Sequence, residues 1–400
     1  MIANIAGGVL MWGLHFLAKR LKEGEYGTFG ALLAVVAVLP TMPLQMIFAQ
    51  QTAKALATGR QRELAGMIRL VWLGTFVIWL VGAGVVFFQQ ENILRILQIK
   101  DSLGLWIMVV SCLLTLWMPM FSGVLQGQQN FLWLGWCMML NGVGRLGVAA
   151  AAVFLVGGYA AGLISGLLVG LLVGIAIAIW QTSWLWRTPS AAFDWRGLLA
   201  QVLPLMLGFG AFQFLFLADT MFVKSYFTGD ETDAYVGAGT LSRALMWLVG
   251  PLAAVMFPRI VHSAAKSEKS DLLRTVLLGT LILSVGGAIG LWLVGPIVVN
   301  IIYPKSYAPL AITLLPWYGF AMVPLSLANV LLNNLLARGA FRVVPVLVVL
   351  VLGYVFALTR WHDSLITVLK VLGGFNLLLF AASAWFTYRA PATTPVQAVT

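Results

Sequence analysis

Long runs of apolar residues recur along the whole 400-residue chain and alternate with short stretches rich in Gly, Pro and charged residues. A bilayer core about 30 Å thick needs about 20 apolar residues for each helical crossing. Runs of this length predict twelve crossings. The first six are expected at residues 2–18, 28–50, 67–88, 104–125, 131–157 and 159–186. The other six are expected at residues 198–223, 235–258, 272–302, 310–336, 341–359 and 365–388.

The polar stretches between these runs are too short to fold separately, because the longest span about 15 residues. The pattern therefore predicts an all-α integral membrane protein with two six-helix bundles, residues 1–187 and 198–389. The polar segment 188–197 is expected to be a cytoplasmic linker, and 390–400 a disordered cytoplasmic tail. The first run lacks the basic start and cleavage site of a signal peptide, so we expect it to be retained.

Composition agrees with a membrane protein and excludes several classes of function. Hydrophobic residues make up 61% of the chain and charged residues 9%, which does not suit a water-soluble globule. Cys112 and Cys137 lie in apolar runs, and the three histidines are far apart, so the sequence predicts neither a disulfide framework nor a metal site. No cofactor is expected. The net charge of +11 is scattered over loop ends, which does not favour nucleic acid as a partner.

The distribution of basic residues predicts the topology. More Lys and Arg residues lie in the connections after even-numbered crossings than after odd-numbered ones, although Lys19, Arg20 and Lys22 follow the first crossing. The positive-inside rule therefore places both termini in the cytoplasm, in a multi-pass protein of the cell inner membrane. Prolines inside the crossings, such as Pro40 and Pro119, are expected to kink the helices.

Two segments indicate an internal repeat. RLVWLGT at 69–75 and RTVLLGT at 274–280 share five of seven residues, and the connections 21–33 and 226–241 both place Gly and acids before a Tyr. A six-helix unit returns the chain to its starting side, so the two bundles should be parallel. Such a pair of bundles encloses a central cavity at its interface.

Three stretches together resemble a known family: LAKRLKEGEYGTFGALL at the end of the first crossing, LADTMFVKSYF at the end of the seventh, and IIYPKSYAPLAITLLPWY between the ninth and tenth. They are similar to bacterial polysaccharide flippases of the multidrug, oligosaccharidyl-lipid and polysaccharide exporter superfamily. The resemblance covers nearly the whole chain, but its motifs are loose and specify the superfamily better than the substrate. It implies two six-helix bundles that alternate between inward-open and outward-open states. It also implies a polyprenyl-diphosphate-linked sugar chain as the cargo.

Four charged residues lie inside the predicted crossings, where each costs about 2.5–3.5 kcal/mol on insertion. Arg145 is the deepest of them, and Asn141 precedes it by one helical turn on the same face. A guanidinium at this depth suits a lipid diphosphate, because its planar donors meet phosphate oxygens in pairs. The alternative is a structural Arg that bonds backbone carbonyls.

Asp219 and Arg243 are expected in the outer third of the membrane, on the seventh and eighth crossings and within reach of one another. Asp219 either pairs with Arg243 or accepts a proton during transport. Both residues are therefore candidates for gating or coupling, with a proton or sodium as the possible coupling ion.

Four other polar residues are candidates for lining the cavity. Lys370 lines it or extends to the membrane interface. His15 faces a wet cavity or is a bonded core histidine. Asn329 and Asn333 form a polar stripe with Ser326, suited either to sugar hydroxyls or to contacts between helices.

Three functions are compatible with a polar membrane interior. The first is a flippase for a polyprenyl-diphosphate-linked oligosaccharide or related precursor, with the lipid-linked sugar and membrane lipids as partners. The second is an ion-coupled exporter of small amphipathic or drug-like compounds. Because one acid accompanies three bases inside the crossings, an anionic cargo is favoured. A membrane enzyme is not expected, since the outer loops are short and capping roles account for their acids.

Overall fold

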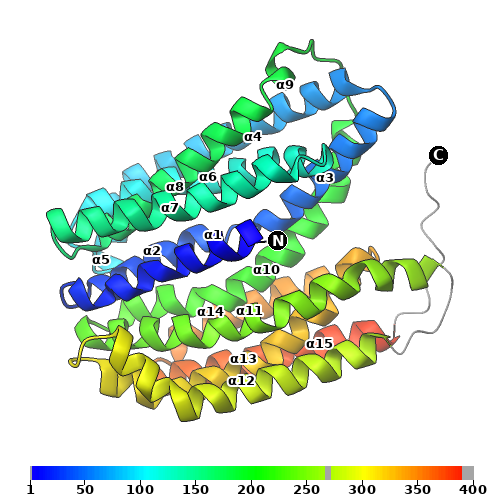
Figure 1. Ribbon diagram of the computed structural model, residues 1–400. Helices are drawn as coiled ribbons and strands as arrows, with labels where there is room; N and C mark the ends of the chain where they lie inside the picture. The colour runs from blue at the N-terminus through cyan, green and yellow to red at the C-terminus, as the bar shows by residue number, and fades with distance from the viewer. Residues whose placement is uncertain (1, 266–271, 390–400) are drawn as a thin grey trace. The chain divides into compact units, whose positions relative to one another are not determined.

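The computed structural model describes residues 2–265 and 272–389, and every element in these ranges is a helix (Figure 1). The first half contains α1 (Ile2–Gly13), η1 (Leu14–Arg20), α2 (Glu25–Ala37), α3 (Thr41–Ala57), α4 (Gln61–Phe88), α5 (Gln90–Ile96), α6 (Ser102–Gly127), α7 (Phe131–Leu155), α8 (Ala160–Gln181) and α9 (Trp184–Arg187). The second half contains α10 (Trp195–Tyr226), α11 (Gly229–Ala265), α12 (Leu272–Ile302), α13 (Ala308–Ala337), η2 (Phe341–Val343), α14 (Val344–Arg360) and α15 (Leu365–Arg389).

The predicted all-α membrane fold is confirmed, and each of the twelve predicted crossings falls on one helix or on two consecutive helices. Within the described ranges, ten helical stretches are long and apolar enough to span a membrane. The short α1 and the long α11 are outside these ten. The chain is therefore a multi-pass membrane protein.

The first two crossings differ from the continuous α-helices that the apolar pattern predicts. The α-helix of the first crossing ends at Gly13 and continues as the 3-10 helix η1. The second crossing is divided at Pro40 into α2 and α3, because proline lacks the N–H that the preceding turn would bond. The kink expected from Pro40 is thus a complete break.

The chain divides into two compact units. Unit 1 comprises residues 1–213 and 227–233, and unit 2 comprises residues 214–226 and 234–400. The predicted bundle limits at 1–187 and 198–389 stay a prediction, as does the central cavity between bundles. The predicted tail at 390–400 lies outside the described residues.

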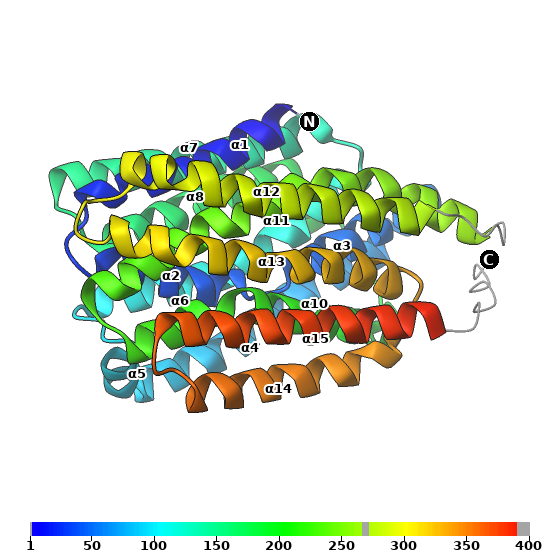
Figure 2. The same ribbon diagram turned by 90° about the horizontal axis from the view of Figure 1, so that it is seen from below.

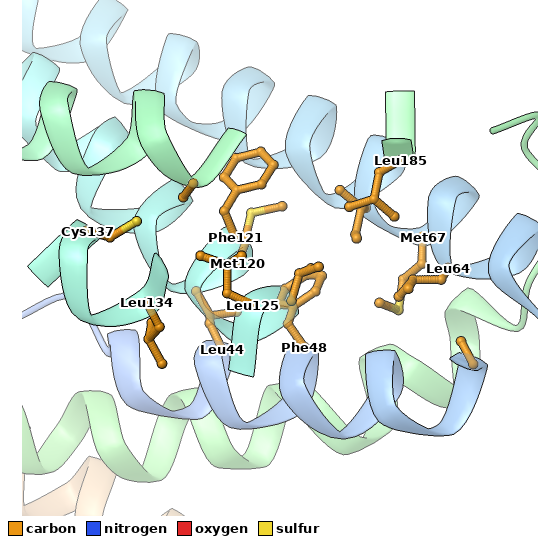
Figure 3. Packing of buried hydrophobic residues seen from close by; sticks show 14 residues of the cluster. Leu44, Phe48, Leu64, Met67, Met120, Phe121, Leu125, Leu134, Cys137 and Leu185 are labelled. Atoms are coloured by element: carbon orange, nitrogen blue, oxygen red, sulfur yellow. The ribbon is translucent and has the colours of Figure 1, made fainter. Parts of the chain in front are cut away.

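The core of unit 1 is an apolar cluster between α3, α4, α6 and α7 (Figure 3). Phe48 on α3 and Phe121 on α6 are almost fully buried in it, and Leu185 on α9 closes the same cluster. Arg69 of α4 donates from Nη2 to the carbonyls of Leu185 and Thr188, at 2.9 and 2.7 Å. These bonds satisfy carbonyls at the end of α9 that have no partner inside the helix.

Glycines let α7 and α8 lie side by side in unit 1 (Figure 1). A Cβ atom at Gly166 would lie 2.4 Å from the carbonyl oxygen of Arg145, and one at Gly170 would lie 2.5 Å from that of Asn141. Larger residues would force the two helices apart. This close packing fixes the backbone that carries Asn141 and Arg145.

In unit 2, α13 and α15 lie side by side, with α14 next to α15 (Figure 2). The buried Asn376 of α15 donates from Nδ2 to the carbonyl oxygen of Ala321 on α13, at 2.8 Å. A Cβ atom at Gly239 of α11 would lie 3.1 Å from the ring of Tyr318 on α13. The absence of a side chain at Gly239 therefore allows Tyr318 to approach α11 closely.

Candidate functional site: two buried polar clusters

The carboxylate of Asp219 is the centre of a buried polar cluster in unit 2. Asp219 is fully buried on α10, and its Oδ1 and Oδ2 atoms accept hydrogen bonds from Nη2 of Arg243, at 2.8 and 2.9 Å. The hydroxyl of Tyr235 donates to Oδ2 at 2.8 Å, and the hydroxyl of Tyr318 donates to the same oxygen. The negative charge is thus neutralised by one cation and hydrogen-bonded by three side chains.

Arg243 is held in one orientation by groups on two helices. Its Nη2 atom also donates to the hydroxyl of Thr220 at 2.9 Å, and its Nε atom donates to the carbonyl of Phe216 at 3.2 Å. The guanidinium carbon lies 5.4 Å from the ring centre of Tyr318, within the range of a cation–π contact. The guanidinium is therefore fixed against α10 and α13.

Helical spacing explains how these residues meet. Asp219 and Thr220 lie three and four residues after Phe216. Residues at these spacings share one face of a helix, here of α10. Tyr235 and Arg243 are eight residues, or about two turns, apart on α11, so both face α10. The expected proximity of Asp219 and Arg243 is realised as an ion pair.

The tyrosines of this cluster could not be recognised as site residues from the sequence. Tyr235 is visible there only as the residue that starts the eighth crossing, and Tyr318 only as part of an apolar stretch. A third tyrosine, Tyr354 of α14, is fully buried within electrostatic reach of Asp219. Within the described part of the chain its hydroxyl has no hydrogen-bond partner.

This difference between the tyrosines gives a prediction. Tyr318→Phe removes a hydrogen bond to a buried carboxylate, and a bond to a charged group contributes about 1.5–3 kcal/mol. Tyr354→Phe removes a hydroxyl that has no partner, so we expect the free energy of unfolding to stay the same or rise slightly. Unfolding of both variants in mixed detergent micelles measures the difference. Equal losses would contradict the described geometry.

A second buried polar cluster lies in unit 1, where η1, α2 and α7 meet. Nδ1 of the buried His15 lies 2.7 Å from the hydroxyl oxygen of Tyr26 on α2. Arg145 of α7 lies close enough to His15 for an electrostatic interaction. His15 is therefore a bonded core histidine on its Nδ1 side, and a cation lies nearby.

Polar atoms without partners lie in and next to this second cluster. Among the described residues, Nε of Arg145, Nε1 of Trp12 and Oδ1 of Asn141 are buried and make no hydrogen bond. Buried polar groups are nearly always hydrogen-bonded, because an unmade bond costs about 1–3 kcal/mol. Two donors and one acceptor in unit 1 are thus available to a bound group.

The remaining candidate residues do not join either cluster. Lys370 of α15 is exposed, and its Nζ lies 5.5 Å from the ring centre of Trp317. Asn333 donates from Nδ2 to Asn329 within α13, to the backbone oxygen at 2.8 Å and to Oδ1 at 2.9 Å. Asn329 lies eleven residues beyond Tyr318, which places it about 16 Å along the helix from the Asp219 cluster.

Solved structures similar to this chain are membrane transporters. An inward-facing multidrug resistance MATE family transporter of the MOP superfamily has a TM-score of 0.68 at 12% identity, over 97% of this chain and 93% of that chain. The lipid II flippase MurJ, in an inward closed conformation, has a TM-score of 0.71 at 13% identity. The match covers 96% of this chain and 86% of MurJ. The Vibrio cholerae MATE transporter VcmN in its bent form has a TM-score of 0.58 at 15% identity, over 97% of both chains.

No protein-family model matches the sequence, and no curated protein matches it. The structural likeness at 12–15% identity therefore concerns the fold. It extends over almost the whole chain, and drug exporters and a lipid flippase both share it. The chain has the fold of the MOP superfamily transporters.

Proposed function

We propose that the protein is an alternating-access flippase that moves a polyprenyl-diphosphate-linked oligosaccharide or related polysaccharide precursor across the cytoplasmic membrane. Both termini lie in the cytoplasm in this proposal. The fold supports a transporter, because its solved neighbours are transporters rather than enzymes. The choice of cargo rests on the charges inside the helices.

The observation that carries the proposal is the uncompensated positive charge of Arg145. The buried carboxylate of Asp219 in unit 2 is already neutralised by Arg243. Within the described residues, Arg145 has a buried Nε atom without a partner, and no ion pair involves its guanidinium. A partly buried cation inside a membrane helix is expensive without an anion, so a negatively charged cargo stabilises it.

The unpartnered polar atoms of unit 1 suit a diphosphate attached to a sugar. A guanidinium binds phosphate oxygens through paired donors. The indole N–H of Trp12 offers a further donor, and Oδ1 of Asn141 offers an acceptor for a hydroxyl. The polyprenyl chain has no need to enter this polar cluster, because it is as apolar as the surrounding lipid.

Asp219 and Arg243 serve the gating role in this proposal. A proton or sodium ion reaches the carboxylate only when Arg243 and the tyrosine hydroxyls move away from it. Opening of the pair then accompanies a change of state. The coupling ion, if the cycle uses one, competes with Arg243 for the same oxygen atoms.

Export of cationic drug-like compounds is the alternative, and one assay separates the two functions. The purified protein is placed in liposomes with a fluorescent polyprenyl-diphosphate sugar, and in others with a cationic dye. We expect protein-dependent translocation of the lipid-linked sugar and no protein-dependent movement of the dye. Dye export without lipid translocation would overturn the proposal.

A further inference from the structure

The segment 227–233 crosses from one unit to the other and back. It groups with unit 1, although the residues on both sides of it belong to unit 2. Its last five residues form the first turn of α11, a continuous helix whose remainder belongs to unit 2. When unit 2 moves relative to unit 1, this strap must either leave unit 1 or bend α11.

Asp233 attaches the strap to the start of α2. Its Oδ2 atom accepts a hydrogen bond from the backbone N–H of Gly24 at 2.8 Å, and its Oδ1 atom accepts one from that of Gly27 at 2.6 Å. Gly24 is the N-cap residue of α2 and has no side chain to bond these donors. Asp233 is 1% exposed, so its charge caps the positive end of α2 in a site shielded from water. Capping is the role expected for the loop acids, but Asp233 caps a helix 206 positions away in the sequence.

Close packing of small residues completes the attachment. A Cβ atom at Gly27 would lie 2.3 Å from the hydroxyl oxygen of Thr232, which is also 1% exposed. A Cβ atom at Gly24 would lie 3.6 Å from Cα of Gly229, and both glycines have positive φ angles of 76° and 52°. The fit therefore requires glycine at position 27, and the positive φ angles favour glycine at positions 24 and 229.

The segment at the start of α2 is also fixed to the start of α8. The N–H of Lys22 donates to the carbonyl of Gly158 at 3.0 Å, and the N–H of Ala160 donates to Oε2 of Glu25 at 2.8 Å. All four residues belong to unit 1. Residues 22–27 thus form a platform that is fixed within unit 1.

We propose that the strap and this platform form a reversible latch, held by Asp233, which opens and closes once in each transport cycle. The latch rests on the proposed alternating-access function, but it does not depend on the identity of the cargo. Its closed form is the one described here. Weakening it raises the population in which the strap has left α2.

Spin labels on the two units test the latch without any cargo. The labels are attached at Lys100→Cys in unit 1 and Lys305→Cys in unit 2, both exposed, with Cys112 and Cys137 replaced by Ala. Pulsed electron paramagnetic resonance of the full chain in lipid nanodiscs then gives the distance distribution. Because no cargo is present, a failed latch is distinguishable from a wrongly assigned substrate.

Asp233→Ala removes two hydrogen bonds to a charge, so we expect the ratio of open to closed populations to rise about tenfold or more. Glu231→Gln is the matched control, because it removes a charge from an exposed side chain of the same turn and should leave the distances unchanged. An unchanged distribution in Asp233→Ala, or an equal shift in Glu231→Gln, would overturn the latch.

A second pair of variants tests the packing if Asp233→Ala folds poorly. Gly27→Ala inserts a methyl group against Thr232 and should open the latch. Adding Thr232→Gly removes the obstructing side chain, and the remaining contact with the Thr232 backbone, at 3.1 Å, needs only a small shift. The double variant should therefore return towards the wild-type distances. Wild-type distances in Gly27→Ala alone would also overturn the latch.

Discussion

Asp219→Asn and Arg243→Gln are each expected to destabilise the protein by about 3–5 kcal/mol and to impair transport. Asp219 is fully buried, so its removal leaves Arg243 with no anion, and removal of Arg243 leaves the carboxylate without its cation. The two tyrosine hydroxyls cannot replace that charge. Unfolding in mixed detergent micelles measures the stability, and the liposome assay measures the transport.

The charge-swapped variant Asp219→Arg/Arg243→Asp is the control for this pair. It keeps one positive and one negative group at the two positions, and the hydroxyls of Tyr235 and Tyr318 can accept hydrogen bonds from an arginine at 219. We therefore expect partial recovery of stability and transport. Damage equal to the sum of the single substitutions would mean that the two residues act independently.

Arg145→Ala is expected to slow translocation of the lipid-linked sugar at least about a hundredfold, because paired bonds to phosphate contribute several kcal/mol at a shielded site. The folded protein should persist, since the guanidinium forms no ion pair among the described residues. Arg145→Lys keeps the charge but loses the planar donors, so its rate should be intermediate.

The control for Arg145 is Arg95→Ala, which removes one positive charge from an exposed connection. We expect this variant to translocate at the wild-type rate. A large loss of stability in Arg145→Ala, with the remaining folded protein still fully active, would instead support the structural reading of Arg145. Similar rates in wild type and Arg145→Ala would contradict the cargo-binding role.

The crossings and the fold could be predicted from the sequence because the bilayer imposes a length on every apolar run. The predicted end of the ninth crossing at residue 302 is also the end of α12, since Pro304 and Lys305 follow it. The apolar runs do not reveal where helices extend beyond the membrane. Helix α4 begins at Gln61, six residues before the predicted start at residue 67, because its polar first turn is also helical.

The candidate site was predictable only where a charge lies inside an apolar run. Asp219, Arg243 and Arg145 stand out for this reason, and spacing along two adjacent crossings brings the first two together. Tyrosine carries no such signal, because it is common in membrane helices as an apolar ring. Tyr235 and Tyr318 therefore emerge only when α11 and α13 are packed.

Capping across the chain could not be predicted from local patterns. The sequence assigns an acid at the start of a helix to that same helix, as for Asp101, whose Oδ1 accepts from the N–H of Leu103 at 3.0 Å. Asp233 and Glu25 instead cap α2 and α8, which are neighbours only in the folded protein. Tertiary packing decides which helix end an acid meets.

In the proposed function, the guanidinium of Arg145, which forms no ion pair in the described part of the chain, binds the diphosphate of a lipid-linked cargo. Native mass spectrometry of the detergent-solubilised protein with polyprenyl diphosphate tests it most directly. We expect the wild-type chain to retain the lipid, and Arg145→Ala to retain it no better than a polyprenol of the same length without phosphate. Equal retention of polyprenyl diphosphate by wild type and Arg145→Ala would contradict the claim.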